Sequence, residues 1–200
     1  MSQISNGRPQ MMFKTICVFC GSSPGANSIY QDSAKNLGLE LAKNSIDLIY
    51  GGGNMGLMGT VSQAVLSSGG KAIGVIPKTI ADKVDHHEIS ELHIVNNMHE
   101  RKQKMFDLSD AFIALPGGFG TLEEILEIIT WAQLGFHQKP IGLMNIDGFF
   151  NSLFDFFNLS VTQKFIKSEH VDMIKSESTP SMLLEALKTY QLPTLDKWQK

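Results

Sequence analysis

Short runs of hydrophobic residues alternate along the chain with longer stretches in which apolar positions recur at helical spacing. The short runs predict buried strands, and the longer stretches predict amphipathic helices. Strands that alternate with helices indicate a parallel sheet covered on both faces, which is a doubly wound α/β fold. We predict strands at residues 15–20, 47–50, 71–76, 111–115 and 140–144, and a weaker one at 93–96. The two clearest apolar helix faces comprise Tyr30, Ala34, Leu37, Gly38 and Leu41, and then Leu122, Ile125, Leu126, Ile129 and Ala132.

The pattern predicts a single folded domain within the 200 residues of the chain. We expect a flexible polar leader at residues 1–12, the folded domain at 13–191 and a short tail at 192–200. Residues 78–92 lack clear periodicity, so we expect a surface excursion near the ligand site. A closing helix is expected from Thr179 onward.

The composition is that of an ordinary soluble protein, with 42% hydrophobic and 18% charged residues. No apolar run approaches the roughly 18 residues that a membrane span needs, and the polar start of the chain resembles no secretory signal. We therefore expect a cytoplasmic protein that does not bind membranes. The formal net charge of -3 argues against nucleic acid as a partner.

The two cysteines, Cys17 and Cys20, fall in one predicted strand. Side chains three residues apart in a strand point to opposite faces of the sheet. A zinc site of this spacing would also need a second cysteine pair, which the chain lacks. We interpret both cysteines as unrelated reduced thiols.

Glycine-rich loops follow three of the predicted strands, at residues 20–26, 51–59 and 116–121. In a parallel α/β sheet, ligands bind beyond the carboxyl ends of the strands. Glycines there let backbone N–H groups approach a phosphate, and the helix that follows adds a favourable dipole. Eight of the 18 glycines fall in the second and third loops. This concentration favours a phosphate site.

The second loop matches the dinucleotide fingerprint at Gly51-x-Gly53-x-x-Gly56. That fingerprint also requires an acidic residue about 20 positions later, at the end of the next strand. The corresponding strand ends instead in Ile76-Pro77-Lys78. Three interpretations stay open: a mononucleotide phosphate shared with the third loop, close packing of strand against helix, and a dinucleotide.

The third loop is the more specific signal. Backbone amides of Gly118, Gly120 and Thr121, with the Thr121 hydroxyl, are suited to cradle one phosphate. Thr121-x-x-Glu124 also fits a capping box, in which the glutamate has only a structural role. Alternatively, the Glu124 carboxylate has a functional role. A carboxylate beside a phosphate repels it, which indicates a nearby cation or a use for the charge.

Arg101 is the candidate for that cation, because the only other arginine of the chain, Arg8, lies in the leader. Residues 97–108 predict a helix whose apolar stripe includes Arg101. Arginine is almost never buried without a partner, and its fork suits carboxylate or phosphate oxygens. The alternative is a side chain that snorkels to water. Lys102, one position further round, can reach the same site or be solvated.

Other chemistries find little support in the sequence. His86, His87, His93 and His99 follow no ligand spacing, so we predict no metal site and interpret these four as surface residues. A Gly-x-Ser-x-Gly nucleophile elbow is missing, which argues against a serine hydrolase of that class. The sequence also singles out no Schiff-base lysine for pyridoxal chemistry.

The combined motifs resemble the Lonely Guy family of cytokinin riboside 5′-monophosphate phosphoribohydrolases. The motifs are Gly51-Gly-Gly-x-x-Gly-Leu-Met-Gly59, Met98-His-Glu-Arg-Lys102 and Pro116-Gly-Gly-x-Gly-Thr-x-x-Glu124. Similarity extends over residues 13–190. Members have often been labelled possible lysine decarboxylases, a name that these residues do not support.

The resemblance implies a Rossmann-like fold, usually dimeric, that needs no cofactor. Its substrate is a small nucleotide, an N6-modified adenosine monophosphate, which is cleaved to the free base and ribose 5-phosphate. Arg101 and Glu124 match the catalytic pair of the family. The expected substrate contacts are Ser22, Gly53, Arg101, Lys102, Gly117, Gly118, Phe119, Gly120, Thr121, Leu122, Glu123, Glu124 and Thr130.

The chain departs from the family pattern in one place, which leaves the preferred base open. Relatives usually carry a substrate-contacting glutamate after the Ile-Pro strand end, where this chain has Lys83-Val84-Asp85-His86. Three alternative functions also stay open: an AMP nucleosidase, an NAD(P)-dependent oxidoreductase, and a non-catalytic nucleotide or cofactor carrier of the same fold.

Overall fold

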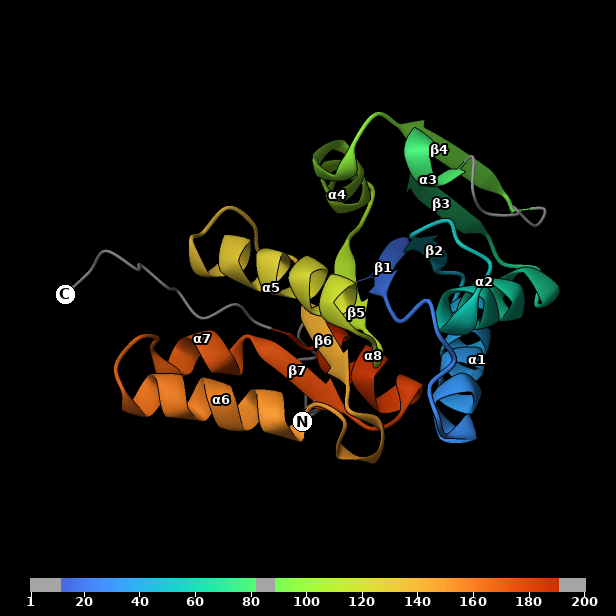
Figure 1. Ribbon diagram of the computed structural model, residues 1–200. Coiled ribbons are helices and arrows are strands. Elements are labelled where there is room, and N and C mark those ends of the chain that lie inside the picture. Colours follow the sequence, from blue (N-terminus) through green and yellow to red (C-terminus); the bar gives the residue numbers. More distant parts are fainter. Residues whose placement is uncertain (1–11, 82–88, 191–200) are drawn as a thin grey trace, which may run out of the picture.

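A computed structural model describes residues 12–81 and 89–190, which form a seven-stranded sheet with helices on both faces (Figure 1). All neighbouring strands are parallel, in the order β4-β3-β2-β1-β5-β6-β7. The strands are β1 (Thr15–Phe19), β2 (Asp47–Tyr50), β3 (Ala72–Pro77), β4 (Glu91–Val95), β5 (Ala111–Ala114), β6 (Ile141–Met144) and β7 (Ile174–Glu177).

Helices cover the sheet in two layers, each built on its own cluster of buried side chains. Three helices pack on one face: α1 (Ser28–Lys43), α2 (Gly56–Ser67) and α8 (Pro180–Lys188). The other face is covered by α4 (Met98–Asp107), α5 (Phe119–Gln133), α6 (Asn151–Thr162) and α7 (Ser168–Asp172). A short α3 (Lys78–Ala81) follows β3, and a 3-10 turn, η1 (Ile146–Gly148), follows β6. The predicted doubly wound α/β fold is therefore confirmed.

The central strand β1 shows why the sequence pattern was informative. Ile16 and Val18 belong to the cluster beneath α1 and α2, whereas Cys17 and Phe19 belong to the cluster beneath α4 and α5. Cys20 lies with the first cluster, and both cysteines are free thiols. The prediction that the two cysteines face opposite sides of the sheet is confirmed.

All six predicted strands are present, and the closing helix is α8. The weaker strand, predicted at 93–96, begins two residues earlier as β4. The edge strand β7 was not predicted, because only Ile174 in its sequence Ile-Lys-Ser-Glu is buried. One strongly apolar position does not produce the alternation by which a strand is recognised.

Residues 78–92 are more regular at their ends than we predicted. Lys78–Ala81 form α3, and residues 91 and 92 already belong to β4. Residues 82–88, which include Lys83-Val84-Asp85-His86, lie outside the described residues, as do residues 1–11 of the leader and the tail at 192–200. Within the described ranges, no helix combines the length and apolar character needed to cross a membrane.

The strand order brings the three glycine loops together. The chain builds β1 to β4 outward in one direction and then returns to place β5 on the other side of β1. Such a reversal of strand order leaves a crevice at the carboxyl ends of the two central strands. The loop after β1 is tied to the other two loops, since Gly21 N–H donates to the Pro116 carbonyl and Leu57 N–H donates to the Gly21 carbonyl, both at 3.1 Å.

The packing of α1 on α2, which lie side by side in Figure 1, depends on Gly38. A Cβ at this position would lie 2.6 Å from the Val61 carbonyl oxygen and 2.7 Å from Ala64 Cβ. We expect Gly38→Ala to lower the free energy of unfolding by about 1–3 kcal/mol, because the two helices must move apart. Gly120→Ala is the matched control, since a Cβ there, also inside a helix, meets nothing within 4 Å. Equal thermal midpoints for the two variants would contradict this account.

Candidate active site

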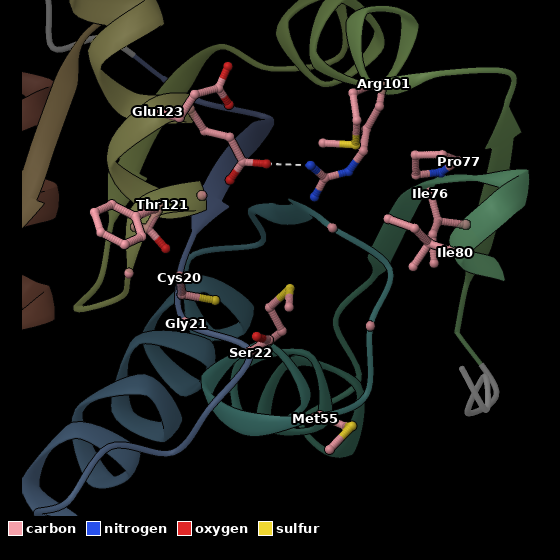
Figure 2. A pocket seen from close by; sticks show the side chains of 18 of the residues that line it. Cys20, Gly21, Ser22, Met55, Ile76, Pro77, Ile80, Arg101, Thr121 and Glu123 are labelled. Carbon is pink, nitrogen blue, oxygen red and sulfur yellow. Dashed lines mark hydrogen bonds and ion pairs between the residues drawn. The ribbon is translucent and has the colours of Figure 1, made fainter. Parts of the chain in front are cut away.

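A cavity of about 520 Å³ opens at the carboxyl ends of the central strands (Figure 2). Its walls come from the loops that follow β1 and β2, from the end of β3 with α3, and from the first turns of α4 and α5. This is the crevice that the reversal of strand order predicts. The elements that meet there are distant in sequence, so only the fold assembles the site.

Arg101 and Glu124 form a buried ion pair at one side of this cavity. Their side chains are 10% and 11% exposed, and a guanidinium nitrogen of Arg101 bonds a carboxylate oxygen of Glu124. In Figure 2 a dashed line marks this bond of Arg101, whose side chain reaches into the cavity. Arg101 Nε also donates to the Val75 carbonyl of β3 at 3.0 Å. The guanidinium is thus held from two sides, as a buried arginine requires.

The start of α4 is specified locally, which fixes where Arg101 lies. Asn97 caps the helix by accepting a hydrogen bond from Glu100 N–H at 2.9 Å. The Glu100 carboxylate in turn accepts a hydrogen bond from Asn96 N–H at 2.7 Å. The expected helix and its apolar stripe are confirmed, with Arg101 and Met105 buried in it.

The environment of Glu124 favours a proton more than that of an ordinary glutamate. Burial raises the pKa of this carboxyl, and the positive charge and hydrogen bond of Arg101 oppose that shift without cancelling it. A raised pKa brings a carboxylate closer to the range in which a general base is most effective. Glu124 is therefore suited to exchange protons within the cavity.

The glycines of the second loop serve mainly close packing. A Cβ on Gly51 would overlap the Arg101 guanidinium, and one on Gly59 would overlap the Asn54 carbonyl. Gly56 has a φ of +58° and leaves no room for a side chain against the Ser22 backbone. The packing interpretation of this loop is thus supported at all three positions. Gly53 differs, because it lines the cavity and a Cβ there would make only ordinary contacts with Met58.

The third loop presents an open helix start to the cavity. A Cβ on Gly118 or Gly120 would meet nothing within 4 Å, so packing requires glycine at neither position. Both line the cavity with Thr121 at the beginning of α5. The first amides of a helix have no partner within the helix, and together with its dipole they favour an anion.

The capping interpretation of Glu124 is wrong. The N-cap of α5 is Gly118, without a side-chain cap, and Thr121 lies within the helix. The Glu124 side chain points to Arg101 rather than back to the helix start. The alternative in which the carboxylate pairs with a cation is the one that the structure forms.

Nine of the thirteen expected contact residues line the cavity, and four do not. The nine are Ser22, Gly53, Arg101, Gly118, Phe119, Gly120, Thr121, Glu123 and Glu124. Among the other four, Gly117 borders a neighbouring hollow, and Leu122 packs against the core beneath α5. Lys102 pairs with Glu123 and Glu127, and Thr130 is exposed on α5, where its hydroxyl donates to the Leu126 carbonyl. The roles of all thirteen residues as substrate contacts stay predictions.

Sequence reasoning missed the apolar wall opposite the glycine loop. In Figure 2, Ile76, Pro77 and Ile80 lie together beside Arg101, and Met55 lies at the lower rim. The apolar members of the wall are Met55, Met58, Ile76, Pro77, Ile80 and Met98, with Cys20 at the end of β1. The signal that could have found it is the presence of apolar residues in a glycine loop and just after a strand end; in the structure, 64% of Met55 and 42% of Ile80 are exposed.

The histidines that the structure describes form no metal site. Across residues 12–81 and 89–190, no three His, Cys, Asp or Glu side chains gather closely enough to hold an ion. His93 pairs with Glu91 on the edge strand, and His99 is exposed. His86 and His87 lie outside the described residues.

Comparisons with solved structures define the class of fold. The molybdenum cofactor binding protein from Rippkaea orientalis aligns with a TM-score of 0.68 at 24% identity, covering 88% of this chain and 95% of that one. The molybdenum cofactor carrier protein from Chlamydomonas reinhardtii aligns with a TM-score of 0.63 at 18% identity, covering 87% and 95%. At these identities the likeness concerns the fold alone, which is Rossmann-like.

Comparisons of sequence define the family. A family model described as "Possible lysine decarboxylase" matches residues 58–187. The chain is 52% identical over 189 residues to a probable cytokinin riboside 5′-monophosphate phosphoribohydrolase of Oryza sativa, covering 94% of this chain and 75% of that one. It is 53% identical over 179 residues to a cytokinin riboside 5′-monophosphate phosphoribohydrolase of Arabidopsis thaliana, covering 89% and 83%. The chain therefore belongs to the Lonely Guy family, as the sequence motifs indicated.

The contact between Gly51 and Arg101 leads to a test that does not depend on activity. We expect Gly51→Ala to lower the free energy of unfolding by about 1–3 kcal/mol, because the new methyl group displaces the guanidinium from its buried partners. In an Arg101→Ala background the same methyl group enters vacated space, so Gly51→Ala should cost much less there. Thermal midpoints of the four proteins measure this difference. Equal losses in both backgrounds would show that the glycine serves another purpose.

Proposed function

We propose that this protein hydrolyses the N-glycosidic bond of N6-modified adenosine 5′-monophosphates and releases the free base and ribose 5-phosphate. The observation that carries this proposal is the buried Arg101–Glu124 pair in a cavity between an open helix start and an apolar wall. The similar plant proteins are named for the same reaction on cytokinin ribosides. The protein is thus a hydrolase acting on a small nucleotide.

The nucleotide is oriented by its two ends. The 5′-phosphate binds at the start of α5, where Gly118, Gly120 and Thr121 present the helix N-terminus to the cavity. The base with its N6 substituent lies against the apolar wall that includes Ile76, Ile80 and Met98. Binding energy from these remote groups places the ribose C1′ beside Glu124 and lowers the barrier to reaction there.

Glu124 performs the chemistry at C1′. Cleavage of an N-glycosidic bond develops positive charge on the ribose, as in glycoside hydrolysis, and an adjacent carboxylate stabilises that charge. The same carboxylate takes a proton from the attacking water. The C1′–N bond breaks, the hydroxyl of water ends on C1′, and a proton ends on the released base.

Arg101 holds Glu124 in place and contacts substrate oxygens. Its guanidinium keeps a proton under all ordinary conditions, so it serves as neither base nor acid. The bond to the Val75 carbonyl fixes its orientation, and the ion pair fixes the carboxylate. Arginine suits this role because its donors are arranged in a rigid fork.

The alternatives fit the site less well. A dinucleotide oxidoreductase would need an acidic residue at the end of β3, where Pro77 is followed by Lys78. A pure carrier has no use for a buried ion pair inside the cavity. An AMP nucleosidase shares the chemistry but leaves the apolar wall without an N6 substituent to contact. A homodimeric assembly and a cytoplasmic location stay predictions.

Incubation with AMP and with N6-isopentenyl-AMP, followed by chromatography for free base, tests the proposal. We expect base release from both nucleotides or from the isopentenyl form alone, with the isopentenyl form cleaved faster. Glu124→Gln and Arg101→Ala should each lower kcat by at least about 10²-fold, the usual contribution of general acid–base catalysis.

Circular dichroism and thermal midpoints check that both variants stay folded, which we expect at lower stability because the two hydrophobic clusters stay intact while a buried ion pair is lost. Retention of activity within about tenfold in either variant would contradict the assigned roles. Faster cleavage of AMP would instead identify an AMP nucleosidase. Binding of either nucleotide without any base release would identify a carrier.

A further inference from the structure

A second hollow, of about 360 Å³, lies next to the active-site cavity. Its walls come from the loop that follows β1, the first turns of α1 and α2, the residue after η1 and the beginning of the third glycine loop. Three residues, Gly21, Ser22 and Gly118, line both the cavity and the second hollow. Because Gly118 caps α5, the two spaces meet at the proposed phosphate site. The other residues of the second hollow take no part in the active-site cavity.

Two aromatic rings form one side of the second hollow. Tyr30 and Phe149 meet edge to face, with 5.8 Å between the ring centroids and 77° between the ring planes. Tyr30 packs on the core beneath α1 and α2, and Phe149 packs edge-on against the buried Phe150 at 5.1 Å. Both rings are thus held by the fold, but Phe149 is still 42% exposed. An aromatic ring that is firmly held beside a hollow and open to solvent is available to a ligand.

Glycines hold the loops around the second hollow in place. Gly25 has a φ of +80°, and a Cβ there would lie 2.7 Å from the Tyr30 ring, so glycine lets the loop after β1 close onto that ring. A Cβ on Gly117 would overlap the Thr121 side chain, so the third loop lies directly against the start of α5. Preformed concave spaces of roughly 300–1,000 Å³ are the usual binding sites of small molecules. The second hollow has the size and the fixed walls of such a site.

The lining of the second hollow favours an uncharged, flat ligand. Its apolar members are Pro24, Tyr30, Leu57, Pro116 and Phe149. The polar groups are the hydroxyls of Ser22 and Ser23 and the backbone of the glycines. Among the described residues that line the hollow, none carries a charged side chain. A charge buried without a partner is costly, whereas a neutral ring can pack on the aromatic side and bond the serine hydroxyls with its polar edge.

We propose that the second hollow binds the free base that the reaction releases, and that it does so while a nucleotide occupies the active-site cavity. This inference rests on the proposed function, because that reaction is the source of the base. The nucleotide and ribose 5-phosphate both carry the charge of a phosphate group. Of the three organic molecules in the reaction, only the N6-substituted adenine is both neutral and planar, as the lining of the hollow requires.

Calorimetric titration of N6-isopentenyladenine into E124Q saturated with AMP tests the inference, because this variant should keep AMP uncleaved. We expect one equivalent of the base to bind while phosphorus NMR shows that AMP stays bound. In E124Q/F149A the affinity for the base should fall about tenfold, which is what one aromatic contact and its buried area contribute. E124Q/F149Y keeps the ring and should keep the affinity. AMP should bind equally to all of these proteins, because Phe149 does not line the active-site cavity.

The matched control is E124Q/F136A, which should bind the base as E124Q does. Phe136 is 72% exposed and lines neither the cavity nor the second hollow. Three results would overturn the inference. They are displacement of AMP by the base, equal affinity for the base with and without the Phe149 ring, and no binding of the base up to its limit of solubility.

The titration requires no turnover, so its failure can be told apart from failure of the proposed function. Lack of base release by the wild type would overturn the proposed function, and the affinities of the Phe149 variants would still decide whether the second hollow binds the base. Normal base release by the wild type, together with any of the three contrary binding results, would overturn this inference alone.

Discussion

The ion pair between Arg101 and Glu124 is the interaction on which the site depends. A charge removed from water is costly unless an opposite charge and hydrogen bonds compensate it. Here α4 supplies the cation, α5 the anion and β3 a carbonyl acceptor. Because none of the three can be displaced without leaving a buried charge unpaired, the pair fixes two helices and a strand relative to one another. The absence of a side chain at Gly51 is a consequence of the same pair.

The same constraint gives the Glu124 carboxylate a fixed position beside the cavity. The helix that carries Glu124 also begins at the proposed phosphate site, since α5 starts at Phe119. Under the proposed function, this one helix sets the distance between the phosphate and the reacting carbon. The apolar wall comes from β3, the neighbouring helices and the second loop, and β3 is tied to Arg101 through the Val75 carbonyl. Under the proposed function, substrate binding and catalysis therefore both depend on the position of α5.

Most of the fold was predictable because its strands are buried on both faces and its helices on one. Residues of β1 and β5 are almost wholly buried, and their apolar runs are unmistakable. Edge strand β7, with one buried residue, was not predictable in this way. At the site, the sequence indicated Arg101 and Glu124, but local spacing also allowed a capping box. The structure excluded it, because α5 begins before Thr121 and because Glu124 pairs with Arg101 of α4.

The sequence by itself determined the periodicity of the elements, the three glycine loops, and a lone arginine on an apolar helix stripe. These are properties of neighbouring residues, so local spacing carries them. The tertiary structure decided which charges meet: Arg101 with Glu124, and Lys102 with Glu123 and Glu127. It also decided that methionines and isoleucines from four elements form one wall. Such contacts join residues far apart in sequence, and they exist only once the strand order and helix packing have brought them together.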